Sequence, residues 1–452
     1  QLFKPKAHFY WLLIFWLLSC ALAFVDLGEL PLRDFDEGTV ARVSLELSEK
    51  RGINQLLPTL WGVDYLNKPP GIHWLISKAI QFFHPQTEKV TSLPSEFIIR
   101  FIPALLSTFI VPLGGLIQWF LTPKDRLSSI ATAGILLTLL PLVRHGRLAM
   151  LDGTQLSAIA LFWLLLISLD GTSKDKWRAL GVGLSSSSML LLKAPLLIPT
   201  ALAGLIPLCI ESRQKRLITL RLIKWVSIGF IPGISWHIWN ALERGSGAIW
   251  LWWGDGAGRV LFYPGSGSEL GWRVPLIEMI EGGWPWILLL PFAFIWAWYE
   301  RKTRWGLWTL SLYAVLAFSI FPLKTQLPWY SHALWLPMSL LCGRPLAWLV
   351  HRIGSQRLPA KKLVSFIPTL WSVLGVVLVF VGLLGVLQIW KFFVPYGYMA
   401  LLAGLGWSLG GFLLLNKVKS KRFIGLFVVI GGSFSALFFL MTSSIWLWEL
   451  NE

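Results

Sequence analysis

Charged side chains gather in two places soon after the first long apolar run of the sequence. Asp36 and Glu37 come first, and Lys68 follows later in the same segment, directly before Pro69 and Pro70. A carboxylate can take a proton from a hydroxyl group, a lysine can neutralise a phosphate, and prolines fix the neighbouring backbone. Charged groups beside a membrane are costly to hold and are therefore functional candidates. These residue types are the components of a group-transfer site.

A further carboxylate, Asp152, begins a later apolar run and lies close to Arg147. Either Asp36 or Asp152 alone can be explained as a helix cap, because a carboxylate binds the free N–H groups of a first helical turn. Two carboxylates from separate loops on one membrane face are better explained as a base and a partner that orients the acceptor or binds a cation. We therefore expect Asp36 to be the base, Asp152 and Glu37 to assist it, and Asp34 to be the cap.

The elements that must position these residues are membrane helices. The chain has 452 residues, of which 55% are hydrophobic, and a soluble domain cannot bury that much apolar surface. A helix needs about 20 residues to cross a bilayer. Thirteen runs are predicted to cross, at approximately 8–26, 97–121, 127–144, 155–169, 177–193, 195–210, 221–240, 285–300, 304–322, 330–350, 363–387, 395–415 and 423–447. The shorter run 72–83 and the segment after Asp36 are predicted to be amphipathic helices, the former lying on the membrane surface.

The net charge of +17 indicates topology and not nucleic-acid binding. The basic residues cluster in alternate loops between the apolar runs, which is the positive-inside pattern of a membrane protein. With the N-terminus in the cytoplasm, four segments lie outside: residues 27–96, 144–154, 241–284 and 323–329. We therefore expect one transmembrane domain, with its site on the outer face and with no soluble C-terminal domain.

Further candidates lie in the same outer segments. Arg259 and Lys324 add positive charge, and together with Lys68 they can neutralise a phosphate leaving group. Tyr330 either belongs to the interfacial aromatic belt or lines a site. The three cysteines lie in apolar runs, and there is neither a P-loop nor a cysteine–histidine metal spacing, so the sequence predicts no nucleotide and no disulfide framework.

Several short motifs occur in a specific order along nearly the whole chain. They are Phe35–Glu37, Tyr65–Leu75, Ile99–Ala104, Arg147–Asp152, Leu192–Pro195, Pro285–Trp286 and Leu323–Tyr330. Their order and spacing resemble the GT-C superfamily of glycosyltransferases that use polyprenyl-phosphate sugars. The closest resemblance is to the branch of the lipid A aminoarabinose transferase and the protein O-mannosyltransferases, which have thirteen spans and surface helices in the first external loop.

The resemblance implies a lipid-linked sugar donor, an outward active site, and transfer with inversion at the anomeric carbon. It implies that Asp36 deprotonates or orients the acceptor, that Asp152 is the second-loop carboxylate, and that Lys68 contacts the donor phosphate. The residues that match positions near the donor, or that we add as substrate-binding candidates, are Tyr65, Arg147, Arg259 and Tyr330.

Three positions depart from the family pattern and bear on a bound metal. Asn67 stands where many relatives have a glutamate that binds a metal in some members, and Gly256 stands where a histidine or asparagine is frequent. Gln326 replaces a lysine that is common before the Leu-Pro pair. The metal ligands are therefore unknown, and a divalent metal is an open question.

The expected partners are an undecaprenyl or other polyprenyl-phosphate sugar and a lipid, glycan or protein acceptor, at the outer face of a bacterial inner membrane. A lipid or polysaccharide transporter or flippase is the alternative, but it predicts charges deep within the spans, whereas here they concentrate at one face. A third alternative is a non-catalytic assembly subunit, if the departures from the family pattern reflect lost catalysis. The sequence identifies neither the sugar nor the acceptor.

Overall fold

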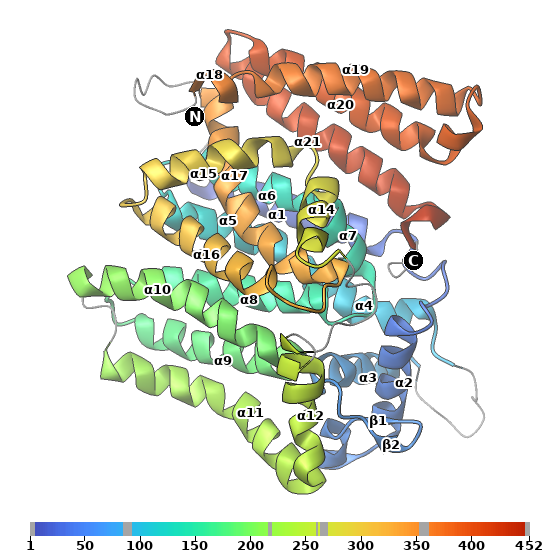
Figure 1. Cartoon of the computed structure of the whole chain (residues 1–452), viewed down its shortest axis with the longest axis vertical. Helices are drawn as coiled ribbons and strands as arrows, with labels where there is room; N and C mark the ends of the chain where they lie inside the picture. The colour runs from blue at the N-terminus through green and yellow to red at the C-terminus, as the bar shows by residue number, and fades with distance from the viewer. Residues whose placement is uncertain are drawn as a thin grey trace.

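The computed structural model describes residues 5–84, 93–215, 219–258, 261–262, 270–351 and 361–447. These residues form an almost entirely helical protein (Figure 1). The strands within them are β1 (Thr59–Leu60) and β2 (Val63–Asp64), which pair antiparallel in a short hairpin. The predicted helical fold class is confirmed, and this hairpin in the first loop is an addition to it.

The first loop contains the two amphipathic helices that the sequence predicts. After α1 (Pro5–Phe24), the chain forms α2 (Asp36–Glu49), the turn η1 (Gly52–Leu56), the hairpin, and α3 (Gly71–Phe83). Helices α2 and α3 pack against each other. Their buried apolar faces consist of Val40, Val43, Leu45 and Leu47 on α2 and Ile72, Ile76 and Ile80 on α3.

The predicted helix cap at Asp34 is wrong. Helix α2 begins directly after Phe35, and no side chain caps its first turn. Asp36 and Glu37 are instead the first two residues of the helix itself. Negative charge there is favourable because the N-terminal end of a helix dipole is positive.

The helices after the first loop follow the predicted apolar runs. The first group is α4 (Glu96–Ser107), α5 (Ile110–Leu121), α6 (Arg126–Leu137), α7 (Leu140–Arg147), α8 (Asp152–Ile167), α9 (Asp175–Lys193), α10 (Leu197–Lys215) and α11 (Leu220–Arg244). The second group is α12 (Trp250–Trp252), α14 (Arg273–Gly282), α15 (Leu290–Tyr299), α16 (Arg304–Ile320), α17 (Trp335–His351), α18 (Lys361–Val364), α19 (Ile367–Val386), α20 (Gly397–Leu415) and α21 (Lys419–Met441). Short turns join them at η2 (Ala194–Leu196), η3 (Gly245–Ile249), η4 (Trp253–Gly258), η5 (Trp286–Leu289), η6 (Pro328–Leu334), η7 (Lys391–Tyr396) and η8 (Ser444–Leu447).

Every predicted span contains a helix, but fewer helices are individually long and apolar enough to cross a membrane. Within the described residues there are 6 such helical segments, or up to 8 if each of two bent pairs counts as one span. The bent pairs are α6 with α7, at 57°, and α14 with the helix over Trp286–Tyr299, at 110°. Helices α1 and α8 are apolar but shorter. A multi-pass membrane protein is therefore confirmed, while the count of thirteen spans stays a prediction.

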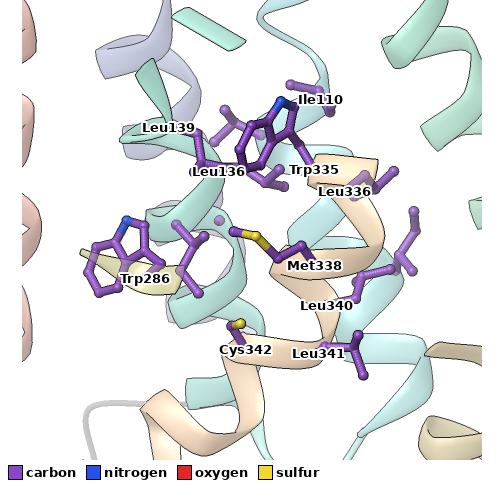
Figure 2. Close-up of a cluster of buried hydrophobic side chains, with 14 of the residues drawn as sticks. Ile110, Leu136, Leu139, Trp286, Trp335, Leu336, Met338, Leu340, Leu341 and Cys342 are labelled. Atoms are coloured by element: carbon purple, nitrogen blue, oxygen red, sulfur yellow. The ribbon is translucent and has the colours of Figure 1, made fainter. Parts of the chain in front are cut away.

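The helices are arranged in three groups (Figure 1). A central block contains α1, α5, α6, α16 and α17, with α8–α11 on one side of it and α19–α21 on the other. Helix α17 is the centre of the core, and Figure 2 shows its side chains packed against neighbouring elements. The side chains labelled there are Ile110, Leu136, Leu139, Trp286, Trp335, Leu336, Met338, Leu340, Leu341 and Cys342, all of them buried. The Trp286 indole also donates a hydrogen bond of 2.9 Å to the Thr138 hydroxyl.

Candidate active site

Segments far apart in the sequence converge on one pocket of about 450 Å³. The first loop, the start of α8, the connection between α9 and α10, the region after α11, and the end of α16 with η6 all contribute to its lining. The polar residues that matter for the argument are Asn67, Lys68, Asp152, Gln155, Lys193 and His332. The structure thus brings together residues from all four segments that the charge pattern predicts to lie outside.

Asp152 is the carboxylate at the polar end of this pocket. It is the first residue of α8, and its Oδ1 lies 2.9 Å from the Nζ of Lys193, the last residue of α9. Burial opposes ionisation of the carboxyl group, but the charge of Lys193 and its hydrogen bond outweigh burial and lower the pKa of Asp152. Nearby His332 and Lys68 act in the same direction. Asp152 is therefore held as an anion.

Asp36, the predicted base, does not line the pocket, but it lies near enough to Asp152 to feel its charge. Its side chain is 21% exposed, and its Oδ2 is 3.9 Å from the guanidinium of Arg33. Burial raises the pKa of Asp36. The negative charges of Asp152 and Glu37 raise this pKa further, and the positive charges of Arg33 and Lys193 only partly compensate. The two carboxylates thus have pKa values shifted in opposite directions, which is the arrangement that separates a base from a permanently charged partner.

Glu37 is a structural residue and not a group that faces the pocket. Its side chain is fully buried, and its two carboxylate oxygens accept from Arg100 at 2.8 and 2.7 Å. The same oxygens accept from the backbone N–H of Ala149 at 2.7 Å and of Arg33 at 3.0 Å. Glu37 therefore connects α2 to α4 and to the segment that leads into α8. The predicted catalytic role is replaced by a positioning role, since these bonds hold Asp36 in place relative to Asp152.

Arg147 and Tyr65, predicted to bind substrate, instead stabilise the fold. The fully buried Arg147 donates to the carbonyls of Leu22 and Val25 at 2.7 and 2.6 Å, and its guanidinium lies 4.4 Å from the Trp446 ring centroid. Tyr65 is buried in an apolar cluster of the first loop, with its ring 5.7 Å from that of His73. Neither residue lines the pocket, because buried backbone and apolar partners occupy their side chains.

The predicted phosphate-binding residues have different positions. Lys68 lines the pocket and is half-buried. Lys324 is exposed and follows Leu323, which lines the pocket, but Lys324 itself does not. Arg259 lies outside the described residues. Tyr330 lines the pocket, and the Nζ of Lys193 lies 5.3 Å from the centroid of its ring.

The three positions that depart from the family pattern lie in different surroundings. Asn67 lines the pocket, whereas Gln326 is buried and its amide nitrogen donates to the carbonyls of Ile320, Phe321 and Leu323 at 2.9, 3.2 and 2.9 Å. Gly256 lies within the turn η4. Among the described residues, no three or more histidine, cysteine, aspartate or glutamate side chains are grouped to hold a metal ion. The question of a divalent metal therefore stays open.

Gln155, Lys193 and His332 line the pocket but are not among the site residues predicted from the sequence. Lys193 was noticed only as part of a motif, although a lysine at the predicted outer end of an apolar run opposes the positive-inside pattern. His332 lies at the start of a predicted span and is not distinguished there by its sequence context. It is 2% exposed, it lines the pocket, and its ring centroid is 4.2 Å from that of His145.

Comparison with known proteins supports the same family relationship. No family model matches the chain. The undecaprenyl phosphate-alpha-4-amino-4-deoxy-L-arabinose arabinosyl transferase of Yersinia pestis is 25% identical over 446 residues, covering 91% of this chain and 75% of the relative.

Solved structures share the fold along most of the chain. The crystal structure of ArnT from Cupriavidus metallidurans in the apo state has a TM-score of 0.72 at 16% identity, over 96% of this chain and 78% of that one. The structure of the same protein bound to undecaprenyl phosphate has a TM-score of 0.69 at 18% identity, with coverage of 96% and 77%. The predicted resemblance is thus confirmed: the chain is similar in sequence to these arabinosyl transferases and shares the fold of the ArnT structures.

Proposed function

We propose that this relative of the aminoarabinose transferases moves a sugar from a polyprenyl-phosphate donor to an acceptor hydroxyl, with inversion at the anomeric carbon. The observation that carries the proposal is the pair of neighbouring carboxylates, Asp36 and Asp152, whose pKa values are raised and lowered respectively. Asp152 lines a pocket whose walls are mostly apolar, and Asp36, which does not line that pocket, is close enough to Asp152 for its pKa to be raised by the charge of Asp152. The positive-inside pattern supports the outer membrane face as the place of reaction.

The apolar part of the pocket suits a lipid chain. It includes Leu156 of α8 together with Leu196, Ile198 and Leu202 at the start of α10. Ile198 and Leu202 are 59% and 50% exposed, so the pocket continues onto a helix face that a bilayer would cover. A polyprenyl chain can therefore extend from the membrane into the site without crossing polar surface.

The polar end of the pocket suits the phosphate and the sugar. Lys68 neutralises the phosphate charge that develops as the donor bond breaks. Tyr330 lines the same pocket. Lys324 and Arg259 belong to adjacent outer segments and are proposed to add positive charge when donor is bound. A bound divalent metal would serve the same purpose, but no step of the mechanism depends on it.

The reaction requires one proton acceptor and one leaving group. The acceptor hydroxyl attacks the anomeric carbon, forming a new C–O bond, while the C–O bond to the phosphate breaks and its electron pair leaves with the polyprenyl phosphate. The hydroxyl proton passes to Asp36, whose raised pKa makes it a better base than an ordinary aspartate. Asp152, held ionised by Lys193, orients the acceptor and stabilises positive charge at the anomeric carbon.

The direct test is release of undecaprenyl phosphate by purified protein in lipid nanodiscs. The first donor to supply is labelled undecaprenyl phosphate-aminoarabinose, followed by other undecaprenyl-phosphate sugars, with candidate lipid, glycan and protein acceptors. We expect Asp36→Asn to reduce transfer at least about 100-fold while donor binding and thermal unfolding stay unchanged. A transporter or an assembly subunit would release no undecaprenyl phosphate. Full activity of Asp36→Asn would refute the role of this residue.

A further inference from the structure

The candidate active-site pocket contains two buried polar side chains that the proposed mechanism does not use. Gln155 and His332 line the pocket and are 1% and 2% exposed. Both atoms of the Gln155 amide and both ring nitrogens of His332 lack hydrogen-bond partners among the described residues. A buried polar atom without a partner costs about 1–3 kcal/mol, so such groups normally have a bound partner.

The two side chains come from different elements and line the same pocket as Asp152. Gln155 lies three residues after Asp152 on α8, so the two project from the same face of the helix. His332 belongs to η6 and lines the same pocket as Asp152. The ring of His145 packs edge-on against His332 at an interplanar angle of 76°, which fixes the direction of its ring.

The chemistry of these groups indicates what they bind. An amide offers two donors and an acceptor oxygen, and a neutral imidazole offers one donor and one acceptor. A sugar hydroxyl both donates and accepts, so it matches either group. Charged substrate groups have other partners in the pocket, since Lys68, the proposed phosphate-binding residue, also lines it and Asp152 is paired with Lys193.

We propose that Gln155 and His332 form a subsite that binds the ring hydroxyl groups of the donor's sugar. This inference rests on the proposed function, because it requires a lipid-phosphate sugar in the pocket. The sugar is bonded to the phosphate, so placing the phosphate at Lys68 leaves the sugar between Lys68 and the Asp152 end of the pocket. Gln155 and His332 line that same cavity and would distinguish one sugar from another by the positions of its hydroxyl groups.

The experiment compares a lipid that carries a sugar with one that does not. We would measure the dissociation constants of undecaprenyl phosphate and of undecaprenyl phosphate-aminoarabinose in nanodiscs, or of whichever undecaprenyl-phosphate sugar binds most tightly in a panel. Gln155→Leu and His332→Leu should each weaken the sugar-bearing lipid about tenfold, the value of one hydrogen bond. The double variant should weaken it about 100-fold. The affinity for undecaprenyl phosphate itself should change less than twofold.

Gln118→Leu is the matched control. Gln118 on α5 is fully buried, its amide also has no partner among the described residues, and it does not line the pocket. It should leave the affinities for both lipids unchanged. Thermal unfolding of Gln155→Leu and His332→Leu should occur at the wild-type temperature or above it, because replacing an unpartnered buried polar group by an apolar one is neutral or stabilising.

The outcomes separate the subsite from the proposed function. Unchanged affinity for the sugar-bearing lipid in the double variant, or equal weakening of both lipids, would overturn the subsite and leave the transferase proposal standing. Failure of the wild-type protein to bind either lipid would overturn both. Wild-type protein that binds all sugars of the panel and undecaprenyl phosphate equally would also overturn the subsite, because no sugar contact would then contribute to affinity.

Discussion

Replacing Lys193 with glutamine removes the positive charge that keeps Asp152 ionised. The Nζ of Lys193 is 2.9 Å from the carboxylate, and the two side chains are 24% and 13% exposed. A hydrogen bond to a charged group in such a partly buried place contributes about 1.5–3 kcal/mol. Since 1.36 kcal/mol corresponds to a factor of ten, the proton affinity of Asp152 should rise between about tenfold and about 150-fold. Lys193 also opposes the rise in the pKa of Asp36, so both carboxyl groups should become harder to ionise.

The assay is the pH dependence of undecaprenyl phosphate release. Activity requires Asp36 and Asp152 as anions, so the acid limb of kcat/KM should move to higher pH in Lys193→Gln. A general loss of structure would lower the rate at every pH without moving this limb. Arg178→Gln is the control, because Arg178 forms a comparable ion pair with Asp175 at 2.7 Å, remote from the pocket. Superimposable acid limbs in wild type and Lys193→Gln would refute the assigned role of the ion pair.

The same variant has a signature in stability. The pKa of Asp152 is lowered in the folded protein, so its ion pair stabilises the fold above the ordinary aspartate pKa and ceases to do so as pH falls through the lowered value. The difference in thermal stability between wild type and Lys193→Gln should therefore be largest near neutral pH and disappear in acid. A difference that is independent of pH would contradict this explanation.

Two further variants distinguish holding the site together from binding the donor. Glu37→Gln leaves the fully buried Arg100 without its anionic partner, which should cost about 3–5 kcal/mol of folding free energy. In contrast to Asp36→Asn, this variant should unfold at a clearly lower temperature and lose activity as a result. Wild-type thermal stability of Glu37→Gln would contradict the positioning role of Glu37. Lys68→Gln should raise the dissociation constant of undecaprenyl phosphate about 10- to 100-fold, because a charge-assisted hydrogen bond is lost. The control is Lys391→Gln, since Lys391 is an exposed lysine that does not line the pocket. An unchanged affinity in Lys68→Gln would exclude Lys68 from the phosphate site.

The positions of the helices were predictable because long apolar runs are a strong signal that does not depend on neighbours in space. The convergence of separate loops was predictable from charge, since the positive-inside pattern placed the segments of Lys68, Asp152 and Tyr330 on one face. The two amphipathic helices of the first loop were predictable from the period of their apolar residues. The bends within predicted spans, such as that between α6 and α7, depend on packing and were not visible in the sequence.

The direction of individual side chains was the main source of error. Asp36 and Glu37 are adjacent, yet Asp36 stays partly exposed near Arg33, whereas Glu37 forms a fully buried ion pair with Arg100. Lys193 and His332 lie at the ends of predicted spans, where the sequence alone does not show which neighbouring elements they face. Arg147 was predicted to bind substrate, but its guanidinium donates to the carbonyls of Leu22 and Val25 at the end of α1, which is far from Arg147 in the sequence. Such partners are decided by tertiary structure alone.

The indole of Trp446 has a consequence for how the protein matures. It is buried beneath the guanidinium groups of Arg100 and Arg147, at 5.4 and 4.4 Å, and its backbone carbonyl accepts from Arg144 at 2.9 Å. Trp446 lies beyond α21 and is therefore translated after every pocket residue. Asp36 and Asp152 are therefore translated before Trp446, the residue against which Arg100 and Arg147 pack. The packing of Arg100 and Arg147 against Trp446 can therefore form only after the helices that carry the pocket residues have been synthesised.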